Sequence, residues 1–295
     1  MRRSSHTPTL LPVWAWLALF LFAPLLIVLK IAWSEAADAV PPYAPLLTAD
    51  TGLRLHASTA AFAQVLTDPL YRRALALSVT IAGLSTALCL AIGYPMALAI
   101  ARAPARRQGL LLILVMLPFW TGFLMRLNAW IGLLQDGGWI VRTVAWLGAA
   151  PAPHLLYTQA AVYLGMVYTY LPFMVLPLYA RLSKLDPTLL DAAADLGASP
   201  ARVFLAVTLP LSLPGVWAGV LLVFVPALGE YVIPELLGGP QAQMLGRVLW
   251  EEFFANRDWP TASALAIVML ALLAMAALLG MGARYAMAAT RRVRP

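Results

Sequence analysis

The sequence predicts an all-α membrane protein with six transmembrane helices. Of its 295 residues, 62% are hydrophobic and 11% are charged, whereas ordinary globular chains are about 45–50% apolar and about 25% charged. The mean hydropathy is +0.82. Apolar runs recur along the chain at the length of about 20 residues that crosses a bilayer core about 30 Å thick. This composition excludes a soluble enzyme, a disordered chain and a disulfide scaffold.

The residues that usually carry chemistry do not form a catalytic or cofactor motif. The one cysteine, Cys89, lies in an apolar run, and the three histidines are far apart, so no metal-ligand cluster is expected. Neither Lys30 nor Lys184 follows a glycine-rich phosphate-binding loop. We therefore expect no catalytic residue, metal or cofactor in this chain. Any ATP and magnesium that it uses would be bound by another protein.

The first apolar run covers residues 10–33 and is followed by a polar stretch, residues 34–73. A signal peptide is the alternative, because Ala37-Asp38-Ala39 resembles a cleavage site. The apolar core of a signal peptide is only about 7–15 residues long, however, and this run is longer. We therefore expect a retained membrane helix followed by an outer loop.

Five further spans are expected at residues 74–101, 109–129, 156–180, 207–228 and 259–283. The third is interrupted by Leu117-Pro118, and a long connection over residues 229–258 precedes the sixth. Several spans contain proline. In lipid, a backbone carbonyl freed by proline must find another partner. Such bent helices are typical of transporters and channels, although ordinary kinking in a membrane bundle is the alternative.

Six spans put both termini on one side of the membrane, and the basic residues indicate which side. With the termini inside, twelve Lys and Arg residues are cytoplasmic and seven are outside. Cytoplasmic loops are enriched in these residues, so this orientation is favoured. Arg72 and Arg73, at the outer end of the second span, reduce the bias. The twelve inside residues are Arg2, Arg3, Arg102, Arg106, Arg107, Arg181, Lys184, Arg202, Arg284, Arg291, Arg292 and Arg294. The net charge of +7 therefore reports topology, and no nucleic-acid partner is expected.

The polar segment after the fourth span has the signals of two short helices joined by a tight turn. Asp186 suits an N-cap, and Pro187 suits the first helical position. Gly197 suits the residue after the helix end, because glycine accepts a positive φ. Ser199-Pro200 then repeats the starting signal. We expect a first helix of about ten residues, a turn and a second helix.

A thin, capped helix on the inner face of the membrane is suited to a groove in a partner protein. The alternative is a helix that lies on lipid. Asp191 and Asp195 disfavour the alternative, because the inner leaflet attracts basic rather than acidic side chains.

The same segment resembles the EAA loop of permease subunits of ATP-binding-cassette (ABC) importers. The loop's pattern is Glu-Ala-Ala, three residues, Gly, nine residues, an aliphatic residue, any residue and Leu-Pro. This chain has Asp191-Ala192-Ala193, Gly197, Val207 and Leu209-Pro210 at the matching spacing, with Asp in place of Glu at 191. The resemblance implies the type I ABC importer permease fold. It also implies that an ATPase subunit docks at the loop, through Asp191, Ala192, Ala193, Gly197, Leu209 and Pro210.

Other stretches resemble the polyamine branch, the first permease subunit of spermidine/putrescine importers, over about residues 71–285. They are Gly93-Tyr94-Pro95 and residues 117–132, 228–239 and 257–260. Permeases for phosphonates, ferric iron and sulfate share much of this framework. The resemblance implies an N-terminal helix and periplasmic loop over residues 1–70 and a permease domain over residues 71–285, with the EAA loop at about 186–210. Residues 286–295 would be a basic cytoplasmic tail.

The resemblance also implies the partners. They would be two copies of an ATP-binding subunit, which bind ATP and magnesium, a second homologous permease and a periplasmic substrate-binding protein. The chain itself would not be an enzyme. It would lie in the bacterial inner membrane as a multi-pass protein, with both termini in the cytoplasm.

A polyamine is a flexible polycation, so a path for it would need carboxylates and aromatic faces. Glu230 and Glu235 lie near the outer end of the fifth span, and charges near a span are expected to be functional. Arg126 has two alternative roles, a structural ion pair with Glu230 or the binding of an anionic substrate. The aromatic candidates could instead be interfacial or packing residues. They are Trp120, Tyr168, Tyr170 and Tyr231.

Three alternatives to a polyamine importer remain open. The first is an importer of the same kind for a phosphonate, thiosulfate or ferric ion. The second is a stand-alone secondary transporter, for which internal repeats and intramembrane relay acids would be expected. The third is a membrane enzyme, which would need a nucleophile or metal constellation near an interface. The sequence shows no clear sign of the features that the second and third require.

Overall fold

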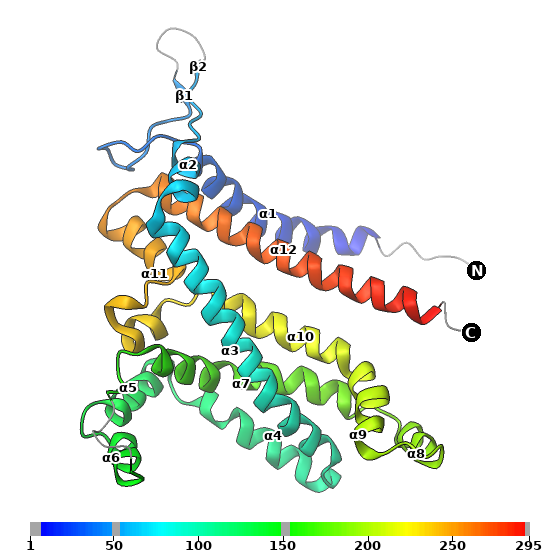
Figure 1. Cartoon of the computed structure of the whole chain (residues 1–295). Coiled ribbons are helices and arrows are strands. Elements are labelled where there is room, and N and C mark those ends of the chain that lie inside the picture. Colours follow the sequence, from blue (N-terminus) through cyan, green and yellow to red (C-terminus); the bar gives the residue numbers. More distant parts are fainter. Residues whose placement is uncertain (1–6, 49–53, 149–153, 293–295) are drawn as a thin grey trace. The chain divides into compact units, whose positions relative to one another are not determined.

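The computed structural model describes residues 7–48, 54–148 and 154–292, and these are almost entirely helical (Figure 1). Arg2, Arg3 and Arg294 of the topology count, Asp50 of the outer loop and the last three residues of the basic tail lie outside the described residues.

Within the described residues, five helical segments are each long and apolar enough to cross a membrane, and a bent pair of segments supplies a sixth candidate span. This confirms the prediction of an all-α membrane protein. The helices of the five single segments are α1 (Thr7–Ala32), α3 (Pro69–Arg102), α7 (Gln159–Leu182), α10 (Leu209–Leu228) and α12 (Trp259–Arg292).

The bent pair corrects the predicted third span. Helix α4 (Ala105–Trp120) is followed by α5 (Phe123–Leu134) and α6 (Trp139–Trp146), with a bend of 86° between the two parts. Thr121 and Gly122 have extended backbone, with ψ of 142° and 140°, which interrupts the helix. The interruption lies beyond the predicted Leu117-Pro118, and residues 123–129 belong to the segment after the bend.

Three other boundaries differ from the predicted spans by five residues or more. Helix α3 begins at Pro69, because Asp68 Oδ1 accepts a hydrogen bond from the Leu70 amide at 2.7 Å and caps it. The fifth span is helical from Pro200, through α9 (Pro200–Val203) and the π-helical turn η1 (Phe204–Thr208), before α10 begins. Helix α12 continues past residue 283 to Arg292.

The connections between the long helices contain further short elements. After α1, the strands β1 (Leu47–Thr48) and β2 (Arg54–Leu55) pair antiparallel and are followed by α2 (Ala60–Thr67). The α7–α10 connection holds α8 (Pro187–Asp195), a short helix that the sequence predicts. The connection between α10 and α12 contains the π-helical turn η2 (Pro234–Gly238), the 3₁₀ turn η3 (Gly239–Gln241), α11 (Leu245–Trp250) and the π-helical turn η4 (Glu251–Ala255).

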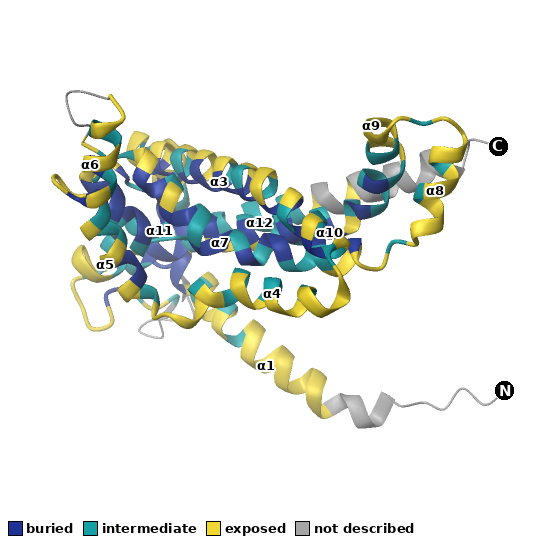
Figure 2. Ribbon diagram, turned by 90° about the horizontal axis from the view of Figure 1, so that it is seen from below, coloured by how far each residue is buried: buried dark blue, intermediate teal, exposed yellow. Residues whose placement is uncertain are grey.

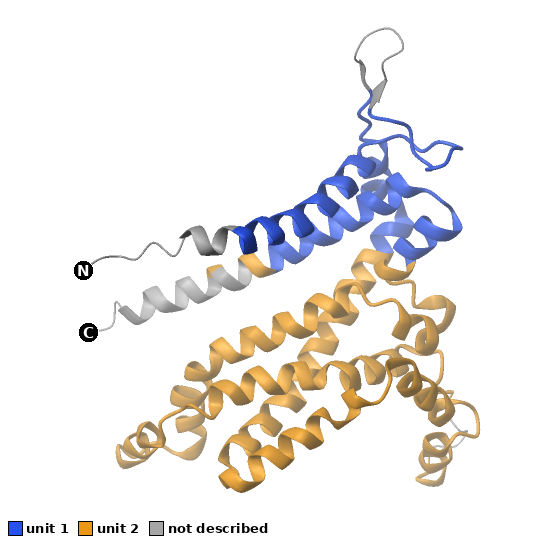
Figure 3. Ribbon diagram, turned by 180° about the vertical axis from the view of Figure 1, so that it is seen from behind, with its two compact units in different colours: residues 1–73, 248–276 blue, residues 74–247, 277–295 orange. Residues whose placement is uncertain are grey.

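The chain divides into two compact units, which Figure 3 colours separately. The first comprises residues 1–73 and 248–276, and the second comprises residues 74–247 and 277–295. In the first unit, the Tyr71 hydroxyl donates a hydrogen bond to Glu252 Oε1 at 3.0 Å, and Asn256 donates one to Glu252 Oε2 at 2.9 Å. These bonds satisfy a buried carboxylate. The predicted division at residues 70 and 285 stays a prediction.

Close packing of α7 against α10 forms the centre of the second unit, and α7 carries many of its buried residues (Figure 2). Gly215 and Gly219 of α10 make this approach possible. A Cβ at Gly215 would lie 2.9 Å from the Pro177 carbonyl oxygen, and one at Gly219 would lie 2.6 Å from Met174 Sδ. Two glycines four residues apart are a common device for close helix packing in membranes.

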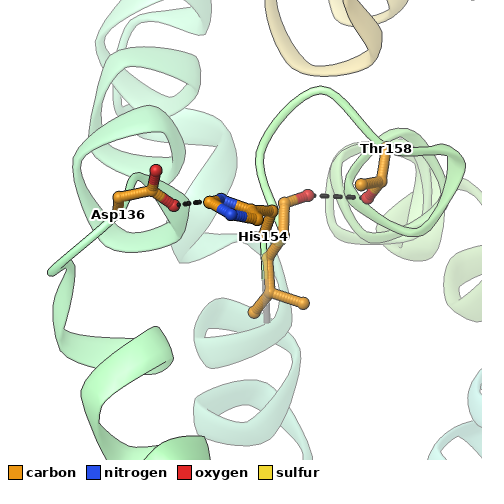
Figure 4. A network of polar contacts seen from close by, with 4 residues as sticks. Asp136, His154 and Thr158 are labelled. Atoms are coloured by element: carbon orange, nitrogen blue, oxygen red, sulfur yellow. Dashed lines mark hydrogen bonds and ion pairs between the residues drawn. The ribbon is translucent and has the colours of Figure 1, made fainter. Parts of the chain in front are cut away.

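Polar contacts define the start of α7 (Figure 4). Thr158 Oγ1 accepts a hydrogen bond from the Ala161 amide at 3.3 Å, which caps the helix, and donates one to the Leu155 carbonyl at 2.6 Å. His154 Nδ1 lies 2.8 Å from Asp136 Oδ1 in the turn after α5. Both side chains of this pair are exposed, so the contact adds little stability.

Candidate functional site

Helix α8 is the first half of the EAA-like loop, and its start follows the sequence prediction. It is nine residues long. Asp186 Oδ1 accepts a hydrogen bond from the Thr188 amide at 3.0 Å, and Pro187 occupies the first position. The backbone amide of Thr188 lowers the pKa of the Asp186 carboxyl, because it stabilises the charged form. The charged cap therefore persists at neutral pH.

Gly197 ends this helix in the left-handed region, with φ of +81°. Its amide bonds to the Ala194 carbonyl at 2.8 Å, and the Ala198 amide bonds to the Ala193 carbonyl at 3.2 Å. A Cβ at Gly197 would meet nothing within 4 Å, so the requirement for glycine is conformational rather than steric. Ser199 has the extended backbone of an N-cap, but its side chain makes no capping hydrogen bond.

The two halves of the loop differ in burial. No residue of α8 is buried, Asp191 and Asp195 are exposed, and Leu196 is 90% exposed (Figure 2). Ala192 is also exposed and Ala193 is half-buried, so alanines occupy much of the surface of the helix. Exposed leucines on an acidic helix with little cover form a surface suited to a protein partner.

The second half of the loop is fixed to the membrane helices. Leu209 and Pro210 are half-buried at the start of α10. Near them, the Tyr94 and Ser212 hydroxyls form a buried hydrogen bond of 2.8 Å, and the Tyr94 ring packs edge-on against Phe204 with centroids 5.6 Å apart. These contacts join η1, which packs against α8, to α3 and α10.

Glu230, just beyond α10, is held by uncharged donors. The Tyr170 hydroxyl donates to its Oε2 at 2.5 Å, and the amides of Val232 and Ile233 donate to Oε1 at 3.0 and 3.4 Å. These bonds orient the carboxylate without neutralising it. Among the described residues, no Lys, Arg or His lies within ion-pair distance of Glu230. The half-buried carboxylate thus lacks a cationic partner within the described residues and retains some acceptor capacity.

Arg126 does not form the ion pair with Glu230 that was one of its two expected roles. Its side chain is packed against two rings, with the guanidinium carbon 5.5 Å from the Phe119 centroid and 5.8 Å from that of Phe123. The residue is 8% exposed, and its Nε and Nη1 atoms are buried without a hydrogen-bond partner. Arg126 is therefore a buried cation stabilised by ring faces rather than by a carboxylate.

Three aromatic side chains, Phe119, Phe173 and Tyr170, connect the surroundings of Arg126 and Glu230. We call them the aromatic run. The Phe119 and Phe173 centroids are 5.2 Å apart, edge to face, and those of Phe173 and Tyr170 are 6.2 Å apart. Arg126 lies on the first ring and Glu230 is bonded to the last. An unpaired cation and an unpaired carboxylate thus stand at the two ends of one aromatic series.

Glu235, the second acidic candidate, is neutralised locally. Its Oε2 lies 3.0 Å from Arg247 Nε, an ion pair without the alignment of a hydrogen bond. Arg247 also donates from Nη1 to the Gly239 carbonyl at 3.1 Å. Glu235 belongs to η2 and Arg247 belongs to α11, so the ion pair stabilises the fold of the connection that follows Glu230. Glu235 is therefore less suited than Glu230 to attract a cation.

The remaining candidates do not gather around Glu230. Tyr168 packs edge-on against Trp130 of α5 with centroids 5.3 Å apart, Trp120 is 76% exposed at the α4–α5 bend, and Tyr231 is half-buried. The sequence reading missed Phe173 and Arg247. No local signal indicates either one, because their roles depend on which helices pack together.

Most of the chain is similar to known transport proteins. Residues 7–285 match the family model described as the binding-protein-dependent transport system inner membrane component. The spermidine/putrescine transport system permease protein PotB of Escherichia coli strain K12 is 38% identical over 255 residues, which are 86% of this chain and 88% of that protein. PotB of Haemophilus influenzae is 38% identical over 264 residues, 89% of this chain and 88% of that protein.

Among solved structures, the chain resembles a bacterial alginate ABC transporter in complex with an alginate pentasaccharide-bound periplasmic protein. The TM-score is 0.69 at 18% identity, and the match covers 92% of this chain and 91% of that one. At this identity the likeness shows a shared fold.

Proposed function

We propose that this chain, which belongs to the family of binding-protein-dependent transport system inner membrane components, carries polyamines into a bacterial cell as one permease subunit of an ABC importer. The family makes it a multi-pass transport subunit of the inner membrane. The polyamine cargo is supported by the 38% identity to two spermidine/putrescine permeases over most of the chain.

The main structural support for a cationic cargo is that Glu230 has no cationic partner among the described residues. Tyr170 and two backbone amides orient its carboxylate, and no cation of the described chain neutralises it. Removing a carboxylate from water is costly unless it gains a partner. A substrate ammonium group would supply that partner, and the neighbouring Tyr170 and Phe173 rings would offer it cation–π contacts.

The energy would come from an ATPase partner. Two copies of the ATP-binding subunit would hold ATP and magnesium, and one copy would dock on α8 through Asp191, Ala192, Ala193 and Gly197. ATP binding would draw the docking helices of this chain and a second homologous permease together. Leu209, Pro210 and the Tyr94–Ser212 contact would pass that movement into α3 and α10. A periplasmic binding protein would deliver the polyamine.

The orientation that fits this scheme places both termini and α8 in the cytoplasm. Glu230 then lies toward the periplasmic end of the permease, where the binding protein would release its cargo. The twelve-to-seven division of basic residues supports this orientation.

One observation favours a second cargo class. Arg126 is buried with two guanidinium nitrogens that have no hydrogen-bond partner, which is also what an anionic substrate such as a phosphonate would require. The experiment is a pull-down of the tagged chain from membranes, followed by uptake assays with labelled putrescine, spermidine and an organophosphonate in the assembled transporter. We expect an ATPase and a second permease to co-purify and the two amines to be taken up. Uptake of the phosphonate alone would reverse the assignment of the cargo.

A further inference from the structure

Arg126 is the one buried arginine in the described part of the chain, and the proposed transport of cations does not by itself explain it. A guanidinium without a carboxylate partner is unfavourable in a membrane domain. The Phe119 and Phe123 faces hold it in place, so its positive charge is fixed rather than mobile. The aromatic run then connects this fixed charge to the Glu230 end of the site.

We propose that Arg126 determines specificity among cationic substrates, by a fixed positive charge that disfavours amines carrying more ammonium groups. The proposal rests on the proposed function. Glu230 attracts the first ammonium of any linear amine. Arg126 repels each further ammonium group that comes near it, whichever end of the amine is bound to Glu230. Spermidine has three ammonium groups and putrescine has two, so the repulsion is larger for spermidine.

The size of the effect follows from Coulomb's law. If the Arg126 guanidinium and the additional ammonium are about 10–15 Å apart and the effective dielectric constant is near 20, the extra unit charge changes the binding constant of the amine by roughly five- to twentyfold. Contact with the substrate is not needed, because a buried charge is screened less than an exposed one. Arg126 would thus hold the ratio of spermidine to putrescine transport below the value that Glu230 and the rings alone would give.

The test measures the ratio of spermidine to putrescine uptake at equal, subsaturating concentrations in vesicles that contain the assembled transporter and its binding protein. The binding protein is the same throughout, so a change in the ratio reports the permease. We expect Arg126→Gln to raise the ratio at least fivefold and Arg126→Lys to leave it within twofold. Arg142→Gln removes an exposed arginine of α6 and serves as the matched control, with no change expected.

A second variant keeps Arg126 in place, in case Arg126→Gln fails to assemble. Ala129 is exposed and lies three residues after Arg126 on α5, so Ala129→Glu can neutralise the guanidinium. We expect Ala129→Glu to raise the ratio and the uncharged Ala129→Gln to leave it unchanged. A ratio within twofold of wild type in Ala129→Glu, or in an assembled Arg126→Gln, overturns the proposal. If Glu230→Gln loses the uptake of both amines while the spermidine-to-putrescine ratio is unchanged in the Arg126 and Ala129 variants, the proposed function is upheld and only the role of Arg126 is rejected.

Discussion

The Tyr170 hydroxyl donates a hydrogen bond of 2.5 Å to Glu230 Oε2, although the two residues are 60 positions apart in the chain. Tyr170 belongs to α7, and Glu230 follows the end of α10. The two helices pack together through the glycines of α10, so the contact depends on the closest helix pair in the second unit. We expect Tyr170 to act as a positioning residue, because it orients a carboxylate that has no ion-pair partner among the described residues.

Replacing Tyr170 by phenylalanine tests that role. The hydrogen bond holds the carboxylate in place, so its loss should misplace the carboxylate and raise the KM for polyamine uptake by roughly severalfold. The maximal rate should change by less than about twofold, because the carboxylate and the ring remain. Tyr163→Phe on the same helix is the control, since the Tyr163 hydroxyl makes no hydrogen bond within the described residues. Equal KM values in Tyr170→Phe and wild type would remove Tyr170 from the site.

The turn at Gly197 gives a prediction about coupling to ATP hydrolysis. A left-handed conformation costs a residue with a Cβ about 1–2 kcal/mol, and more for a β-branched one. Gly197→Val should therefore abolish most of the substrate-stimulated ATP hydrolysis of the assembled complex. Gly197→Asn should retain the larger part, because asparagine tolerates this region. Since no atom lies within 4 Å of an added Cβ, equal losses in both variants would indicate a contact with the ATPase rather than a backbone requirement.

Local signals in the sequence predicted the parts of this protein that depend on local physics. The lengths of the apolar runs predicted the spans, and Asp186, Pro187 and Gly197 predicted the bounds of α8, because caps and positive φ values are decided within a few residues. The expectation of a type I ABC importer permease came from the spacing of Asp191 to Pro210, and the family match confirms it.

The tertiary contacts could not be predicted in this way. Whether Glu230 meets Arg126 or Tyr170 depends on the 86° bend after Trp120, which directs α5 away from a straight span. The Arg247–Glu235 pair depends on how η2 and α11 fold back, and hydrophobic periodicity carries no information about that. The roles assigned to the loop and path residues stay predictions.

The orientation in the membrane can be checked by labelling with a membrane-impermeant thiol reagent. The single cysteine, Cys89, is buried and is replaced by alanine. Cysteines are then introduced singly at Val40, which is 88% exposed in the loop after α1, and at Ala192 of α8. Val40→Cys should react from the periplasmic side and Ala192→Cys only after the cells are opened. Labelling of both positions from one side would contradict the six-span arrangement.

The central claim is that Glu230 is the carboxylate that receives a cationic substrate, and the uptake of labelled spermidine by the Glu230→Gln transporter tests it most directly. Glutamine nearly preserves the shape and removes the charge, so we predict at least a tenfold loss of uptake with ATPase docking intact. Arg126→Gln should not lower uptake, and Glu230→Gln should reduce uptake by the same factor in the Arg126→Gln background as in the wild type, because the two residues form no ion pair. Normal uptake in Glu230→Gln together with abolished uptake in Arg126→Gln would contradict the account and point to an anionic cargo.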